Sequence, residues 1–143
     1  MNLEDLEAIR MLTNRYSHYL DRNQLESLAA LWTEDAVFDE TPFGLGLYHG
    51  RAAIRGFFEH DQGVMEKQVH YATNFVLNSL DGDHASGSCY FLVYGTTKDG
   101  GSVHATGYYD DEYRRVDGTW LFSKRLAVPF LPPKVEAFAK HMK

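Results

Sequence analysis

Residues 69–77 read Val-His-Tyr-Ala-Thr-Asn-Phe-Val-Leu, a run rich in β-branched and aromatic side chains and free of glycine and proline. This composition, with side chains alternating between two faces, predicts a strand. The two faces would carry Val69, Tyr71, Thr73, Phe75 and Leu77 on one side and His70, Ala72, Asn74 and Val76 on the other. Two interpretations of His70 are open here: a hydrogen-bonded core histidine, or a cavity-lining histidine that transfers protons.

This run lies in the first of four long extended segments, at residues 68–80, 84–97, 102–116 and 119–128. The segments are separated by turn signals that each contain Asp-Gly, and Asp-Gly between extended runs is a strong hairpin signal. The four segments therefore predict an antiparallel meander. We expect it to twist and curve, because strands this long do not stay flat.

The first half of the chain is mainly helical in pattern. Apolar side chains recur at three- and four-residue spacing over residues 3–20, and Asn2 can cap this helix. Asn23 and Glu26 resemble a capping box that starts a second, short helix, so Asp21 is not needed as a cap. A turn at 33–35, short strands at 36–39 and 47–49, and a third helix that starts at 51 and fades by 61–63 complete this half.

Helices followed by a meander predict an α+β fold. We expect a cone-like curved antiparallel sheet packed against three N-terminal helices, with an internal ligand cavity. A short amphipathic tail helix follows, between residues 135 and 142. The length of 143 residues fits one domain that covers the whole chain.

The composition restricts the class of partner. A net charge of −6 without a basic patch argues against nucleic acid, whose binding requires lysine and arginine. The single cysteine, Cys89, leaves no internal disulfide and no cysteine-based zinc site. An acidic N-terminal segment and the lack of an apolar run of about 18 residues argue against a signal peptide and a membrane span. We expect a cytoplasmic protein that does not bind membranes.

Four segments resemble one known family. They are Ala8-Ile9-Arg10 with Tyr19-Leu20-Asp21, the run 28–38 (LAALWTEDAVF), the run 50–54 (GRAAI) and the run 113–122 (YRRVDGTWLF). Together they resemble the SnoaL-like branch of the nuclear-transport-factor-2-like superfamily, nearest the scytalone dehydratase and hexachlorocyclohexane dehydrochlorinase group. The superfamily contains cyclases, dehydratases, isomerases, hydrolases and non-catalytic subunits, so the fold alone does not decide the activity.

The resemblance implies roles for individual residues. Residues 69–74 are similar to the histidine strand of those enzymes, so His70 would be the base and Asp21 would orient its ring. Arg115 lies where the dehydrochlorinases carry a functional arginine. Tyr16 stands in the region where they carry a lysine, and Leu20 stands where scytalone dehydratase has a tyrosine. Neither substrate therefore carries over to this chain.

The Asp-His pair offers no nucleophile and needs no metal, and no phosphate-binding glycine loop is present. We therefore expect a cofactor-independent lyase or isomerase, dehydratase- or dehydrochlorinase-like, with a small, cyclic, largely apolar substrate. The alternatives are a cyclase or hydrolase in the same cavity, or a non-catalytic module such as the ring-hydroxylating dioxygenase β-subunit. The candidate substrate-binding residues are Tyr16, Tyr48, Tyr90, His104, Tyr108 and Arg115.

The sheet face away from the helices would carry aromatic side chains, among them Tyr71, Phe75 and Phe91. Apolar groups on an exposed sheet are usually covered by another subunit. We therefore expect a homodimer or homotrimer that assembles through this face.

Overall fold

The computed structural model describes residues 2–142. Two helices, α1 (Leu3–Asp21) and α2 (Leu25–Ala29), come first, followed by β1 (Trp32–Asp39), the 3-10 turn η1 (Thr41–Phe43), β2 (Leu47–His49) and α3 (Arg51–Val64). The meander follows as β3 (Met65–Asp81), β4 (His84–Thr97), β5 (Ser102–Val116) and β6 (Thr119–Pro129), and the short helix α4 (Glu136–Ala139) comes last. The α+β class and the four hairpin-linked strands are confirmed.

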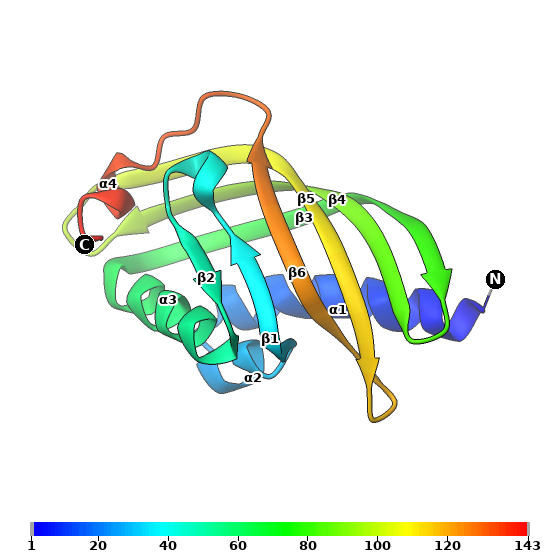
Figure 1. Cartoon of the computed structure of the whole chain (residues 1–143). Helices are drawn as coiled ribbons and strands as arrows, with labels where there is room; N and C mark the ends of the chain where they lie inside the picture. Colours follow the sequence, from blue (N-terminus) through cyan, green and yellow to red (C-terminus); the bar gives the residue numbers. More distant parts are fainter. Residues whose placement is uncertain (1, 143) are drawn as a thin grey trace.

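All six strands form one sheet in the order β2-β1-β6-β5-β4-β3. Neighbouring strands are antiparallel except β1 and β6, which run parallel. The long strands arch over α1, and α3 and α4 lie together at one end of the curved sheet (Figure 1). Because α1 packs on β3 and β6, its C-terminal end reaches the strand that carries His70.

Local chemistry explains the position of α1. The side-chain oxygen of Asn2 accepts hydrogen bonds from the backbone N–H groups of Glu4 and Asp5 at 2.9 and 3.3 Å, so the predicted cap is confirmed. The buried stripe of the helix faces the sheet and consists of Ile9, Leu12, Thr13, Tyr16, Ser17 and Leu20. The helix ends at Asp21, one residue after this stripe.

Two predicted boundaries and one predicted helix cap were wrong. Residues 33–35 lie within β1, whose pairing with β6 is irregular between Trp32 and Val37. Helix α3 continues to Val64, and β3 follows it directly. Asn23 does not cap α2: its φ of +57° places it in the left-handed region that asparagine tolerates, and Gln24 occupies the N-cap without a side-chain bond.

The predicted alternation along β3 holds only as far as Thr73, which is exposed as predicted. Asn74 has a φ of +55°, and the pairing with β4 shifts between Thr73 and Val76. This bulge exchanges the two faces, so Phe75 packs against the core and Val76 is 56% exposed. The prediction that Phe75 faces outward and Val76 faces the cavity was therefore wrong.

The outer face of the meander also differs from the prediction at one further position. Phe91 is buried and stacks on Tyr109 at a centroid distance of 4.4 Å. The outer face instead carries Tyr71, as predicted, together with Tyr90 and Tyr94, all exposed. Within the part of the chain that the structure describes, no helix is long and apolar enough to cross a membrane.

Candidate active site

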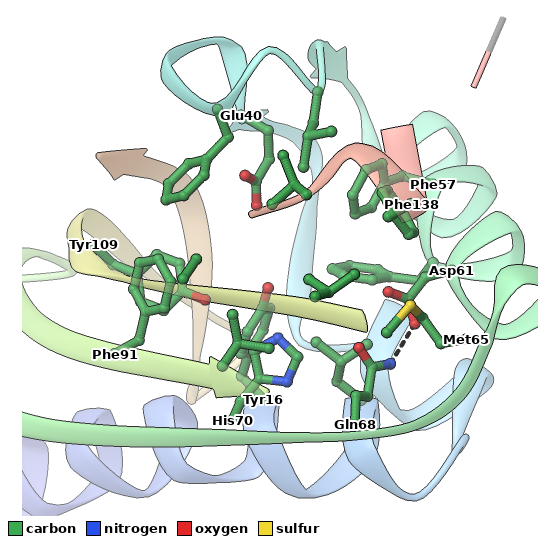
Figure 2. A pocket seen from close by; sticks show the side chains of 18 residues that line it. Tyr16, Glu40, Phe57, Asp61, Met65, Gln68, His70, Phe91, Tyr109 and Phe138 are labelled. Atoms are coloured by element: carbon green, nitrogen blue, oxygen red, sulfur yellow. Dashed lines mark hydrogen bonds between the residues drawn. The ribbon is translucent and has the colours of Figure 1, made fainter. Parts of the chain in front are cut away.

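A pocket lies inside the curved sheet, where α1, α3, α4 and the segment between β1 and β2 approach it (Figure 2). Its apolar walls come from Leu20, Phe43, Leu45, Phe57, Phe58, Met65, Phe91, Val93, Val103, Ala105, Val135 and Phe138. Its remaining lining residues carry polar groups: Tyr16, Glu40, Asp61, Gln68, His70 and Tyr109. A mostly apolar pocket with a few convergent polar groups is typical of a small-molecule site.

Asp21 and His70 are in direct contact at the edge of this pocket. Asp21 Oδ2 accepts a hydrogen bond from the backbone N–H of His70 at 2.7 Å, and Asp21 Oδ1 lies 2.7 Å from His70 Nδ1. Both side chains are largely buried, at 17% and 12% exposure. One carboxylate therefore holds both the backbone and the ring of the histidine.

This contact defines the histidine tautomer. An ionised carboxylate only accepts hydrogen bonds, so Nδ1 of His70 carries the proton and donates it to Asp21. Nε2 is then the nitrogen with the free lone pair, and the His70 ring points into the pocket (Figure 2). A neutral imidazole held in this way can accept a proton from a bound molecule.

Two further carboxyl groups face the pocket, and the sequence interpretation included neither. Asp61 continues the buried stripe of α3, at the spacing set by Ile54, Phe57 and Phe58, and this spacing could have revealed it. Glu40 lies in the segment that follows β1 and has no periodic neighbours. A loop position of this kind gives no sequence signal for the direction of its side chain.

Asp61 is 7% exposed and accepts a hydrogen bond from Gln68 Nε2 at 2.5 Å. Burial raises the pKa of Asp61 to about 6, although the hydrogen bond from Gln68 opposes this rise. Beside the Asp21–His70 pair, the pocket therefore contains a buried carboxyl whose pKa is raised toward neutral pH.

Of the predicted substrate-binding residues, Tyr16 lines the pocket together with Tyr109, which was not predicted. Burial raises the pKa of both hydroxyls, so both stay protonated at neutral pH. A protonated phenol donates a hydrogen bond, which suits a carbonyl or hydroxyl oxygen on a ligand.

Four other predicted residues do not line this pocket. The hydroxyl of Tyr48 donates to the Leu45 carbonyl at 2.5 Å, and its ring lines a separate surface hollow. Tyr90, His104 and Tyr108 lie on the outer face because strand side chains alternate, and their neighbours Phe91, Val103, Ala105 and Tyr109 face the pocket.

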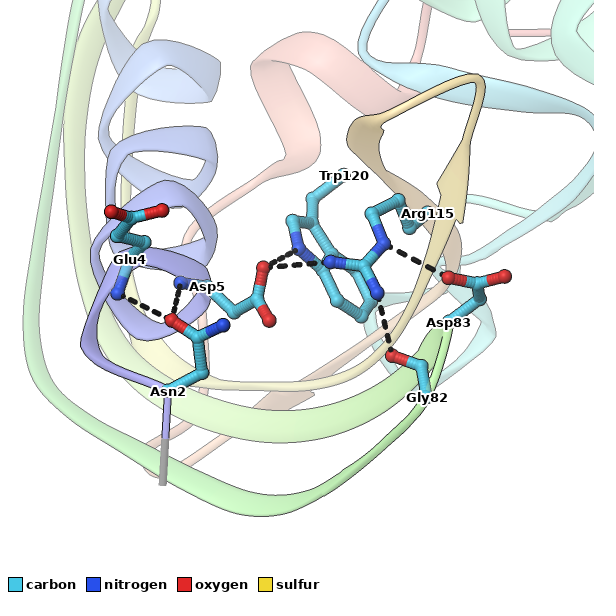
Figure 3. Close-up of polar contacts among 7 residues, drawn as sticks. All are labelled: Asn2, Glu4, Asp5, Gly82, Asp83, Arg115 and Trp120. Carbon is cyan, nitrogen blue, oxygen red and sulfur yellow. Dashed lines mark hydrogen bonds and ion pairs between the residues drawn. The ribbon is translucent and has the colours of Figure 1, made fainter.

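Arg115 is also outside the pocket. Its Nη1 and Nε bind Asp5 and Asp83, each at 2.9 Å, and its guanidinium lies over the Trp120 ring at 5.1 Å (Figure 3). Trp120 Nε1 donates to the same Asp5 oxygen at 3.0 Å. The contacts fasten the start of α1 to the β3–β4 and β5–β6 hairpins, so the predicted position of the functional arginine was wrong.

Arg125 on β6, which the sequence interpretation missed, lies against two residues of the pocket wall. Its guanidinium lies 4.4 Å from the centroid of the Tyr16 ring and 3.8 Å from that of Tyr109. Asp111 binds it through two hydrogen bonds, at 2.8 and 2.9 Å. Arg125 thus supports two pocket-lining tyrosines from behind.

Cys89 is buried, and burial raises the pKa of its thiol to about 11, so it is not a thiolate nucleophile at neutral pH. Among residues 2–142, no group of three or more His, Cys, Asp or Glu side chains is arranged to hold a metal ion.

A curved sheet around a pocket, with helices closing its concave side, is the architecture of the nuclear-transport-factor-2-like class. Within that class, the chain belongs to the SnoaL-like domain family, whose sequence model matches residues 1–126. Gamma-hexachlorocyclohexane dehydrochlorinase of Sphingobium indicum is 31% identical over 131 residues, which cover 88% of this chain and 83% of that enzyme. The relatives of this chain therefore include a dehydrochlorinase-type lyase.

Two solved structures from Novosphingobium aromaticivorans are also similar. One, a proposed aromatic ring hydroxylase, superposes with a TM-score of 0.91 at 33% identity and covers 96% of this chain and 99% of its own. The other, a proposed scytalone dehydratase, has a TM-score of 0.83 at 27% identity, with 91% and 87% coverage. These similarities confirm the resemblance to the dehydratase and dehydrochlorinase group.

Proposed function

We propose that the protein is a cofactor-independent lyase in which His70 is the general base and Asp21 positions it. The contact of Asp21 with both the N–H and Nδ1 of His70 carries this proposal. It supports a neutral imidazole whose Nε2 is directed at a pocket that is otherwise mostly apolar. The substrate class that suits these walls is a small, cyclic, largely apolar molecule.

The chemistry is an elimination. Nε2 of His70 takes a proton from a carbon of the substrate, the electrons of that C–H bond form a double bond, and a leaving group departs from the adjacent carbon. Asp21 stabilises the imidazolium that forms, because its carboxylate already accepts the proton on Nδ1. The protonated phenols of Tyr16 and Tyr109 suit a substrate oxygen that gains charge.

The test compares His70→Gln and Asp21→Asn with the wild type on cyclic compounds that carry a hydroxyl or chloride next to an acidic C–H group. We expect His70→Gln to lower the rate by about 10²–10⁴, as is typical for loss of a general base. His84→Gln is the matched control, since His84 is exposed at the β3–β4 hairpin, far along the sheet from the pocket. If His70→Gln turns over a substrate at the same rate as the wild type, the proposal is overturned.

The alternatives predict different results. A hydrolase or cyclase in which Asp21 itself transfers the proton keeps its activity in His70→Gln and loses it in Asp21→Asn. A non-catalytic binding module turns over none of the compounds and keeps its ligand affinity in both variants. NMR of the histidine ring nitrogens adds a check that needs no substrate: the Nδ1–H signal of His70 is expected in the wild type and lost in Asp21→Asn.

A further inference from the structure

Two pocket-lining carboxyls, Asp61 and Glu40, have no role in the proposed base chemistry; Asp61 is held by Gln68, whereas the side chain of Glu40 has no such partner among residues 2–142. The backbone of Glu40 is fixed, because its N–H donates to the Gly46 carbonyl at 2.8 Å and its carbonyl accepts from Phe43 N at 3.0 Å and Leu45 N at 3.1 Å. Its side chain extends into the pocket from the side opposite the strand that carries His70 (Figure 2). The two groups therefore face the same ligand space from opposite walls.

The environment of Glu40 differs from that of its neighbour Asp39. Asp39 accepts hydrogen bonds from the N–H and the hydroxyl of Thr41, at 2.9 and 2.6 Å. Within residues 2–142, no side chain or backbone group donates a hydrogen bond to the Glu40 carboxyl, which lies among apolar walls such as Phe43 and Leu45. A carboxyl in such a site is more stable with its proton than without it.

The groups around Glu40 also favour the protonated form of its carboxyl. Burial raises the pKa of Glu40 to about 8, and the charges of Asp39 and Asp61 contribute to the rise while Arg125 opposes it. A carboxylic acid that keeps its proton at neutral pH can donate it, as a general acid must.

We propose that Glu40 is the general acid of this site, placed opposite His70 to protonate an oxygen leaving group. The inference rests on the elimination proposed above and adds the identity of the leaving group. When Nε2 of His70 takes the proton from carbon, the C–O bond breaks and its electron pair stays on oxygen. The Glu40 proton moves to that oxygen and gives water, leaving Glu40 as a carboxylate and His70 as an imidazolium; exchange with solvent restores both.

The inference selects a substrate class. Hydroxide is a poor leaving group and needs a proton as it departs, whereas chloride leaves as a stable anion without one. A pocket with an acid opposite its base therefore suits dehydration of a cyclic alcohol better than loss of hydrogen chloride. The competing role for Glu40, an ionised partner for a substrate cation beside Asp61, requires that Glu40 has lost its proton at neutral pH.

The first experiment needs no substrate. Glutamate labelled at the carboxyl carbon is followed by NMR in the wild type and in Glu40→Gln, over the range from about pH 3 to pH 10. We expect one carboxyl that titrates near pH 8 in the wild type and is missing in the variant. If Glu40 instead titrates at its ordinary value near 4.5, it holds no proton to donate at neutral pH, and the inference is overturned.

The second experiment separates the acid from the base. The two probes are 3-hydroxycyclohexanone and 3-chlorocyclohexanone, which lose water or hydrogen chloride to give the same unsaturated ketone. We expect Glu40→Gln to lower the rate of water loss by about 10²-fold and to change loss of hydrogen chloride less than about 3-fold, while His70→Gln lowers both. The alkaline limb of the pH profile for water loss should disappear in Glu40→Gln.

The outcomes distinguish the two proposals. If His70→Gln lowers neither rate, the elimination itself is wrong. If His70→Gln lowers both and Glu40→Gln lowers both equally or neither, the elimination stands and the role of Glu40 is refuted. Glu40→Asp, which restores an acid on a shorter side chain, should recover part of the rate of water loss.

Discussion

Arg125 and Asp111 form a bidentate ion pair in the core behind the pocket, with Nε to Oδ1 at 2.8 Å and side chains that are 1% and 0% exposed. Replacing Arg125 by methionine leaves the Asp111 carboxylate buried without its cation. We expect Arg125→Met to lower the free energy of unfolding by about 3–5 kcal/mol, as is typical when one partner of a buried pair is removed. Urea-induced unfolding followed by fluorescence measures this loss.

Two controls accompany this prediction. Asp111→Asn combined with Arg125→Met removes the stranded charge and keeps an acceptor for the Tyr113 hydroxyl, which donates to Asp111 at 2.8 Å, so most of the stability should return. Arg114→Ala, which breaks an exposed pair with Asp35, should leave the unfolding midpoint unchanged. A loss below about 1 kcal/mol in Arg125→Met contradicts the importance of the pair.

The bulge at Asn74 makes a second prediction possible. Its φ of +55° is tolerated by asparagine and glycine but strains a β-branched residue. We therefore expect Asn74→Gly to fold with nearly unchanged stability and Asn74→Val to lose about 1–2 kcal/mol. Thr73→Val, at the exposed neighbouring position, is the control and should change stability by less than about 0.5 kcal/mol. Equal stability of Asn74→Val and the wild type would show that the bulge is not enforced by the backbone.

The fold could be predicted from the sequence because its strongest signals are local. The Asp-Gly turns at 81–83 and 117–118 and the apolar stripe of α1 depend on neighbours in the chain. The bulge at Asn74 could not be predicted, because it depends on the pairing of β3 with β4. It therefore reversed the faces predicted for Phe75 and Val76.

The residues of the candidate site were also predicted only in part from the sequence. Asp21 and His70, 49 residues apart, were paired from a resemblance and are in contact in the structure. Strand alternation predicts that Tyr90 and Phe91 face opposite sides but not which of them faces the pocket, and the prediction assigned the two faces the wrong way round. Glu40 was missed because it lies in an irregular segment, where the direction of a side chain depends on tertiary contacts.

The stability of the protein should depend on pH through Glu40. Between about pH 4.5 and pH 8 the folded protein holds a proton that the unfolded chain has released, so the free energy of unfolding falls as pH rises through this window. Glu40→Gln removes the dependence. We expect the variant to match the wild type below about pH 4.5 and to exceed it by a few kcal/mol above about pH 8.

Thermal unfolding at a series of pH values measures this difference. Asp61→Asn is the matched comparison: because the raised pKa of Asp61 is about 6, its stability difference from the wild type should stop changing near pH 6 and stay constant above it. A Glu40→Gln difference that is the same at every pH would mean that Glu40 keeps its ordinary pKa in the folded protein.

The last prediction concerns the outer face of the meander, defined by Tyr71, Tyr90 and Tyr94, which are exposed on neighbouring strands β3 and β4. We propose that a second copy of the chain covers this face in a homodimer or homotrimer, because exposed aromatic side chains gathered on a sheet favour association. Sedimentation equilibrium should give a mass above that of the monomer for the wild type, and Tyr90→Lys combined with Tyr94→Lys should shift it toward the monomer. Leu47→Lys, exposed on β2 at the edge of the sheet opposite β3, is the control and should not change the mass. A wild-type monomer at micromolar concentration would contradict this assembly.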